Sequence, residues 1–102
     1  MIETGSHVIV RADRAGIVYG TLGAREDGTI CITGARQIWS WADGAALCAL
    51  DLAARGVGEV SSGHRISAPV SAVEILAGDI VQMAVMSPPA VASLDAVEDW
   101  AP

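Results

Sequence analysis

Alternation of apolar and polar residues in the first third of the chain predicts β-strands. Runs rich in Val, Ile and Thr, which favour the pleated backbone of a strand, occupy residues 7–11, 17–22 and 29–33. The Asp27-Gly28 pair before the third run is typical of a hairpin turn. We therefore predict a three-stranded antiparallel meander at the N-terminal end of the chain.

The pattern then changes to one that predicts a central helix over residues 45–55. Asp43 is a suitable N-cap, and Gly56 is a suitable residue at the end of the helix. Leu47 and Leu50 lie on one stripe of this helix. We expect the stripe to pack against the meander.

The last third of the chain predicts a loop, two strands and a short helix. Residues 56–69 contain three Gly, three Ser and one Pro, and so predict a long connecting loop. Two apolar runs, at 70–76 and 79–86, predict a C-terminal strand pair, and the Pro-led segment 88–96 predicts a helix. The fold class is thus α+β, with residues 1–102 as a single domain.

Composition bears on partners and location. The chain is 52% hydrophobic but has no Phe, so its core is thin, and thin cores favour homo-oligomers. A net charge of −6 argues against duplex DNA and membrane surfaces as partners. We find no export signal and no apolar run of the ~18 residues that a membrane span needs. Cys31 and Cys48 are expected to be buried free thiols, which favours the cytoplasm.

Motifs for catalysis or for metal binding are not apparent. His7 and His64 lie far apart in the chain and belong to no metal-ligand motif, and neither cysteine forms a recognisable nucleophile signature with a histidine. The glycines of residues 16–23 belong to a strand pattern and not to a phosphate-binding loop. The sequence therefore predicts a protein that is not an enzyme and that uses no metal and no cofactor.

The segment 34–41, Gly-Ala-Arg-Gln-Ile-Trp-Ser-Trp, is the strongest candidate for a binding site. Trp39 and Trp41 are two residues apart, which puts both indoles on one face of an extended backbone, with Arg36 and Gln37 beside them. Indoles stack on nucleobases, and arginine binds phosphate through two hydrogen bonds. The alternative is that the Trp residues fill the core, above all Trp39, so the ligand hypothesis rests more on Arg36 and Trp41.

Two further polar clusters are weaker candidates. Arg11 and Arg14 flank Asp13 near the first hairpin turn, where they either face solvent or bind an anion across an oligomer interface. His64 and Arg65 form a third cluster in the predicted loop, with an exposed mobile loop as the alternative. The candidate ligand-binding residues are Arg36, Trp41, Trp39, Gln37, Arg11 and Arg14.

Three parts of the sequence together resemble a family of roughly hundred-residue proteins of unknown function encoded by tailed bacteriophages. They are residues 7–11 with 15–16 and 20–22, residues 33–41 with 44–45, and residues 69–76 with the terminal 97–100. The resemblance spans nearly the whole chain, and its most specific part is the Ala-Arg-x-Ile-Trp-x-Trp pattern that begins at Ala35. That family more often has a second Arg where this chain has Gln37, which bears on any site built from two arginines. The resemblance implies a viral protein that acts in the cytoplasm of an infected bacterial host.

Size and the strand-rich plan with two helices also resemble the phage Thoeris anti-defence sponges of the first type. This resemblance implies a homo-oligomer that sequesters cyclic ADP-ribose signals or cyclic nucleotides between protomers without cleaving them. The expected partner is then a small nucleotide-derived ligand. The alternative is a protein-interaction module that inhibits a host protein or serves as a small virion-associated factor, since exposed Trp and Arg also anchor protein interfaces.

Overall fold

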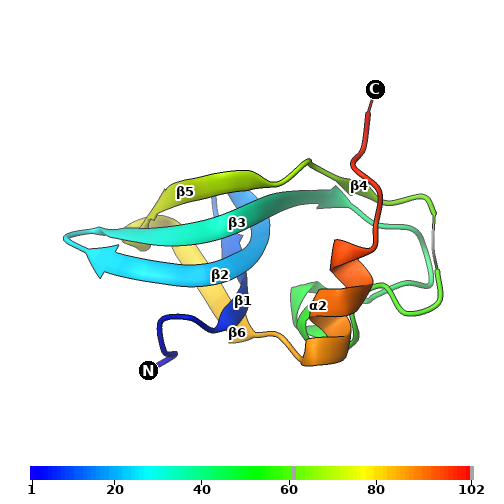
Figure 1. The fold of residues 1–102 in the computed structure, drawn as a ribbon, viewed down its shortest axis with the longest axis horizontal. Helices are drawn as coiled ribbons and strands as arrows, with labels where there is room; N and C mark the ends of the chain where they lie inside the picture. The colour runs from blue at the N-terminus through cyan, green and yellow to red at the C-terminus, as the bar shows by residue number, and fades with distance from the viewer. Residues whose placement is uncertain (61, 102) are drawn as a thin grey trace.

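The computed structural model describes residues 1–60 and 62–101, which form a bent antiparallel sheet with two short α-helices against one side of it (Figure 1). The strands are β1 (His7–Ala12), β2 (Gly16–Glu26), β3 (Thr29–Ser40), β4 (Arg65–Ile66), β5 (Val70–Leu76) and β6 (Ile80–Val85). The helices are α1 (Ala49–Arg55) and α2 (Pro88–Asp95), and a 3-10 turn, η1 (Ala77–Asp79), joins β5 to β6. The predicted α+β class is confirmed.

The sheet is larger than the predicted meander. β1, β2 and β3 pair consecutively and antiparallel, as predicted, but the sheet contains six strands, and β2 and β3 extend to 11 and 12 residues. The predicted loop contains β4, which pairs with the end of β3. The prediction of a C-terminal strand pair is wrong in its pairing, because β5 pairs with β3 whereas β6 pairs with β1. The Asp79 carboxylate accepts the backbone N–H groups of Arg14 and Ala15, which brings the start of β6 to the β1 side.

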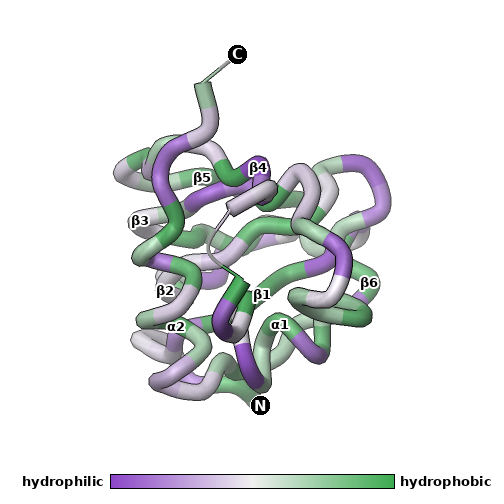
Figure 2. The backbone as a smooth tube through the Cα atoms, turned by 90° about the vertical axis from the view of Figure 1, so that its right-hand side faces the viewer, coloured by the Kyte–Doolittle hydropathy of each residue, from purple (hydrophilic) through white to green (hydrophobic). Residues whose placement is uncertain are grey.

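Both faces of the sheet are buried, each by its own apolar cluster. In β1, Val8 and Val10 point to the cluster enclosed by the bend of the sheet, whereas Ile9 points to the cluster beneath the helices. This two-sided burial explains why the β1 run is apolar at three consecutive positions. Figure 2 shows the two helices next to each other at one end of the molecule, where they cover the second cluster.

The central helix begins later than predicted. α1 starts at Ala49, because the Asp51 carboxylate accepts the backbone N–H of Leu47 and the preceding residues form a turn. The predicted Leu47 and Leu50 stripe is therefore wrong: Leu47 is 89% exposed, and Ala49, Leu52 and Ala53 are buried instead. Cys48, expected to be buried, is exposed for the same reason.

The C-terminal helix agrees closely with its prediction. Ser87 is the N-cap of α2 and accepts the backbone N–H of Ala90, and Pro88 occupies the first helical position. The Ser87 hydroxyl also donates to the carbonyl of Ala54, which ties α2 to α1. No helix in the described part of the chain is long and apolar enough to cross a membrane.

A bulge at Gly34 decides which residues of β3 face which side of the sheet. Between the pairs Tyr19–Arg36 and Thr21–Thr33, β3 has one residue more than β2, and Gly34 adopts a φ of 57° that favours glycine. The extra residue shifts the alternation by one position. Ile32 before the bulge and Ala35 after it both face the enclosed cluster.

Candidate functional site

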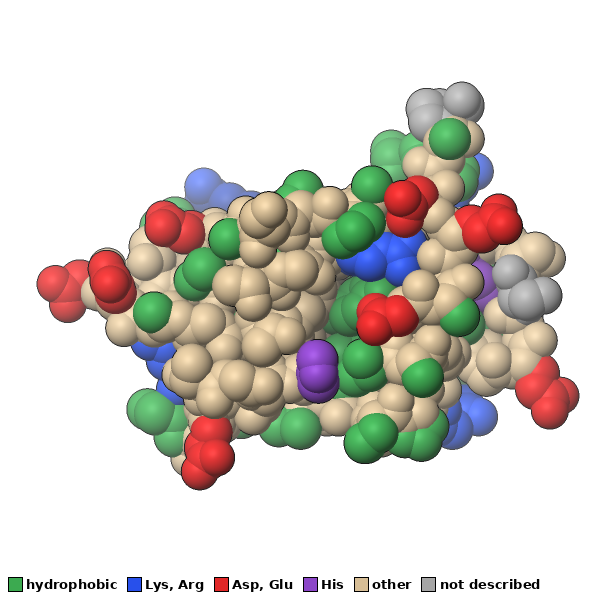
Figure 3. All heavy atoms as spheres, viewed as in Figure 1, with side chains coloured by type: hydrophobic (Ala, Val, Ile, Leu, Met, Phe, Trp, Pro, Cys, Tyr) green, Lys and Arg blue, Asp and Glu red, His purple; other side chains and the backbone are tan. Residues whose placement is uncertain are grey.

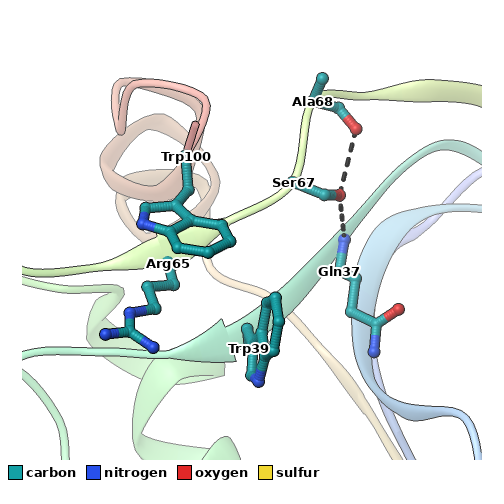
Figure 4. Close-up of a pocket in the computed structure, with 6 residues that line it drawn as sticks. All are labelled: Gln37, Trp39, Arg65, Ser67, Ala68 and Trp100. Atoms are coloured by element: carbon teal, nitrogen blue, oxygen red, sulfur yellow. Dashed lines mark hydrogen bonds between the residues drawn. The ribbon is translucent and has the colours of Figure 1, made fainter. Parts of the chain in front are cut away.

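A pocket of about 510 Å³ opens at the end of β3. Its lining comes from β3, from β4 and the residues after it, and from the C-terminal segment, which passes close to β4 (Figures 1 and 4). We call it the indole pocket, and its lining residues are Gln37, Trp39, Arg65, Ser67, Ala68 and Trp100. It thus combines two of the residues predicted from the sequence with Arg65 and Trp100.

The Gly34 bulge places the β3 residues of the pocket. After the bulge, Ile38 packs beneath the helices, so Gln37 and Trp39 face the opposite side of the sheet. This side is covered by the enclosed cluster as far as Ala35 but is open beyond it. Trp39 is accordingly 69% exposed, so the alternative that it fills the core is wrong.

Two indoles and one guanidinium lie together in the pocket (Figure 4). The rings of Trp39 and Trp100 meet edge to face, with 5.2 Å between centroids and 80° between planes. The Arg65 Cζ atom lies 5.3 Å from the centroid of the Trp100 ring, within the range of a cation–π contact. The ion pairs of residues 1–60 and 62–101 are Arg36–Asp99 and Arg55–Asp51, so the exposed Arg65 guanidinium forms none there.

Arg36 lies beneath the sheet and has all of its donors occupied. It is buried opposite Tyr19 on the helix side of β3. Its five N–H groups donate, over 2.8 to 3.2 Å, to the carbonyl oxygens of Ser67, Leu94 and Val97, the hydroxyl of Tyr19 and the carboxylate of Asp99. A guanidinium has five N–H donors, so none remains for a ligand. The predicted ligand role of Arg36 is therefore corrected to a structural one.

The hydrogen bonds of Arg36 also position Trp100 at the pocket. Arg36 binds the chain at Leu94, Val97 and Asp99, and the backbone N–H of Trp100 donates to the carbonyl of Ile66 in β4. The segment after α2 is thereby tied to the edge of the sheet, next to Arg65. The sequence gives no local signal for this arrangement, because Trp100 and Trp39 are far apart in the chain.

Tyr19 completes the buried network. Its hydroxyl accepts from Arg36 and donates to the Asp95 carboxylate at 2.9 Å. Burial, together with the hydrogen bond to Asp95, raises the pKa of Tyr19 to about 12 and outweighs the lowering effect of Arg36. The side chain is therefore a neutral hydroxyl in the folded protein at ordinary pH.

The other predicted residues lie outside the indole pocket. Trp41 follows the end of β3, packs against the helix-side cluster and donates its indole N–H to the carbonyl of Ala46 at 2.7 Å. Arg11 is exposed in β1. Arg14 lines a separate hollow that also contains three acidic side chains, those of Asp13, Glu74 and Asp79. The expectation that Trp39 and Trp41 share a face is wrong, because the strand ends between them.

His64 holds the segment that precedes Arg65. It is buried, its Nδ1 atom accepts the backbone N–H of Ala42 at 3.1 Å, and its Nε2 atom donates to the carbonyl of Val60 at 2.7 Å. Arg65 therefore follows an anchored residue, which fixes the start of β4. Within residues 1–60 and 62–101, no group of three His, Cys, Asp or Glu side chains is placed to hold a metal ion.

Fold and pocket together define a small α+β domain with an open surface pocket of two indoles and an exposed guanidinium. The chain belongs to the family described as domain of unknown function DUF6948, whose model matches residues 5–94. That match includes Trp39 and Arg65, whereas Trp100 lies beyond it. Comparison with curated proteins and with solved structures finds no match.

Proposed function

We propose that this protein binds and sequesters a small nucleotide-derived ligand in the indole pocket, without converting it chemically. The observation that carries the proposal is the meeting of Trp39, Trp100 and Arg65, which forms no ion pair with the described residues, in one open pocket. Such a pocket offers aromatic surface for a planar ring and a cation for an anionic group.

The two indole side chains of the pocket favour a ligand with a planar ring. A pocket of about 510 Å³ falls in the usual range for small-molecule sites, so a nucleotide fits its size. Trp39 exposes most of its surface, and a base stacked on an indole gains about 1–3 kcal/mol. The perpendicular Trp100 ring forms a second wall beside it.

The charge distribution supports a ligand with few negative charges. The chain carries a net charge of −6, and Figure 3 shows acidic side chains scattered over one face of the molecule, so its overall charge repels anions. Among the described residues that line the pocket, Arg65 is the one that carries a charge. A cyclic nucleotide or a cyclised ADP-ribose, with a small number of phosphate charges, suits this environment better than a polyanion.

The lining also favours binding over catalysis. Its polar side chains are Gln37, Arg65 and Ser67, and the Ser67 hydroxyl accepts the backbone N–H of Gln37 and donates to the carbonyl of Ala68. The described residues that line the pocket include no base that could activate this serine as a nucleophile. A sequestering protein needs only the binding groups.

The proposed biological role follows from the resemblance to tailed-phage proteins and to Thoeris anti-defence sponges. In this role the protein is made in the infected bacterial cytoplasm and withdraws an immune signal from its receptor. The resemblance implies ligand sites between protomers of a homo-oligomer. One chain supplies six residues that line the indole pocket, so we propose one ligand per chain.

Calorimetry and tryptophan fluorescence against cyclic ADP-ribose isomers and cyclic di- and trinucleotides test the proposal. We expect one of them to bind, and we expect Arg65→Gln to weaken it by about tenfold, the effect of one charged hydrogen bond. Arg11→Gln, which changes an exposed arginine outside the pocket, is the matched control. No heat with any ligand, together with no nucleotide released from heated protein, contradicts the proposal.

A second candidate function is a protein-interaction module. The exposure of Trp39 beside Arg65 favours it, because Trp and Arg dominate the binding energy of protein interfaces. Pull-down from host lysate with the wild type and with Trp39→Ala separates the two functions. One stoichiometric host protein that is lost with Trp39→Ala supports the module, whereas a released nucleotide supports the sponge.

A further inference from the structure

The sheet ends on one side at β6, whose outer edge is unpaired in the described chain. The strand order runs from β4 through β3, β2 and β1 to β6, so β6 lies at the opposite end of the sheet from the indole pocket. An unpaired edge presents a row of backbone N–H and C=O groups that can bind another extended strand. This edge is independent of the ligand proposal.

The register of β6 shows which backbone groups point outward. Met86, just after the strand, donates its backbone N–H to the carbonyl of His7, so this N–H points to the β1 side. Hydrogen-bonding direction alternates along a strand, and the register is regular from Gln82 to Val85. The N–H and C=O groups of Met83 and Val85 therefore point away from β1, to the free edge.

The side chains of β6 also suit an interface. Its sequence, Ile-Val-Gln-Met-Ala-Val, has no charged residue, whereas the chain as a whole carries a net charge of −6. Val81 is 62% exposed and Val85 is 56% exposed. A second copy of an acidic chain is repelled over most of its surface, but β6 brings no charge to the contact. By contrast β5, which also pairs on one side only in the described chain, contains Glu74 and directly follows Pro69, and β4 has only two residues, one of them Arg65.

We propose that a second copy of this chain pairs with β6, antiparallel and about a two-fold axis at Met83. The two exposed valines lie two residues to either side of Met83, so this register places Val81 opposite Val85 of the partner subunit. Both are then covered by a cross-strand contact, and the outward groups of Met83 gain partners. Such self-complementarity is required of a two-fold interface and of no other kind of partner.

The geometry limits the assembly to a dimer. Both copies use the same edge, so the contact closes on itself and leaves no second β6 edge exposed. A bulge at Val81, where β6 has one residue more than β1, adds local twist and ends the regular pairing near that residue. The indole pockets, at the far ends of the joined sheet, stay open.

Sedimentation equilibrium from about 1 µM to about 1 mM, a range that covers weak homodimers, tests the proposal. We expect the wild type to approach twice the chain mass of 10.4 kDa, and Val85→Lys to raise the dissociation constant by about tenfold or more. Val70→Lys, at a valine in β5 that is 52% exposed, is the matched control and should dimerise like the wild type. A wild type that stays at one chain mass, or a Val70→Lys variant that dissociates equally, overturns the proposal.

Met83→Pro tests the backbone contribution separately. Proline removes an N–H that faces away from β1, so the intramolecular sheet should form, as circular dichroism and thermal melting can verify. We expect this variant to be folded and monomeric. A folded Met83→Pro that still dimerises like the wild type contradicts strand pairing at this edge. Ligand titration of the same variants reports on the indole pocket, so failure of the dimer and failure of the ligand proposal are distinguished.

Discussion

Replacement of Arg36 by methionine should strongly destabilise the protein. Methionine keeps the unbranched apolar stem but removes all five hydrogen-bond donors. Two of the contacts that are lost, to the Tyr19 hydroxyl and the Leu94 carbonyl, are fully buried. Tyr19 keeps its hydrogen bond to Asp95 and the Leu94 carbonyl keeps the backbone N–H of Val97, so each loses its charged partner but not its last one. The contact to Asp99 adds little, because that carboxylate is 57% exposed.

The expected loss is about 3–6 kcal/mol, because two buried hydrogen bonds to a charged group are lost and each contributes about 1.5–3 kcal/mol. A domain of this size has about 5–15 kcal/mol of stability, so the variant should fold but melt some 15 °C or more below the wild type. Arg65→Met is the matched control: its guanidinium is exposed, so its stability should change by about 0.5 kcal/mol or less. Urea unfolding followed by far-ultraviolet circular dichroism measures both.

A second signal tests whether Arg36 positions Trp100. Because Arg36 ties the segment after α2 to the sheet, its loss should separate the Trp39 and Trp100 rings and weaken their joint near-ultraviolet circular dichroism signal. Arg36→Lys, which keeps the charge and has fewer donors, should fall between the wild type and Arg36→Met. If Arg36→Met loses less than about 1 kcal/mol, or no more than Arg65→Met, then the buried network does not carry the stability assigned to it.

Three other predictions address packing and titration. Gly20→Ala should cost about 1–3 kcal/mol in chemical denaturation, because its Cβ would lie 2.7 Å from Ile32 Cγ2 and from the Thr33 carbonyl, whereas Gly78→Ala, with open space around it, should be neutral. Tyr19 is the only tyrosine, so absorbance titration of the folded protein should give a midpoint near 12. The raised pKa of Tyr19 stabilises the fold fully below pH ~10, and this stabilisation is lost as the pH rises toward 12; it should be absent in Tyr19→Phe. Hydrogen bonds from Arg55 and from the Leu47 backbone lower the pKa of Asp51 to about 2. These bonds therefore stabilise the folded protein above pH ~4, and this stabilisation is lost as the pH falls toward 2; Asp51→Asn should remove this pH dependence of stability.

Local patterns predicted the parts of the fold that local interactions determine. The meander follows from alternation and the Asp27-Gly28 turn, and α2 follows from the Ser87 cap and Pro88. The start of α1 depends instead on the Asp51 side chain, which binds the backbone N–H of Leu47 and so favours a turn where helix propensity continues. The partners of β5 and β6 depend on which strand edges stay free once the meander has formed, and no short window of sequence records this.

The candidate site was predictable only in part. Of the residues proposed from the Trp-rich segment, Gln37 and Trp39 line the pocket, and their ligand role stays a prediction. Arg36 was misassigned because arginines are mostly exposed, and its burial requires acceptors from residues 94 to 99 that only the folded chain supplies. Trp100 and Arg65 join the site for the same reason, through contacts between distant segments.

One glycine links the stability of the domain to its pocket. The bulge at Gly34 turns Arg36 toward the helices, where its five donors hold the C-terminal segment, and turns Trp39 toward the open side. Without the extra residue the alternation would shift by one, so Arg36 would face the open side and Trp39 the buried one. The same backbone feature therefore places the indole in the pocket and the arginine that brings the second indole to it. Arg36 and Trp39 are three residues apart, so ordinary alternation puts them on opposite faces of β3, and the bulge decides which face each of them takes.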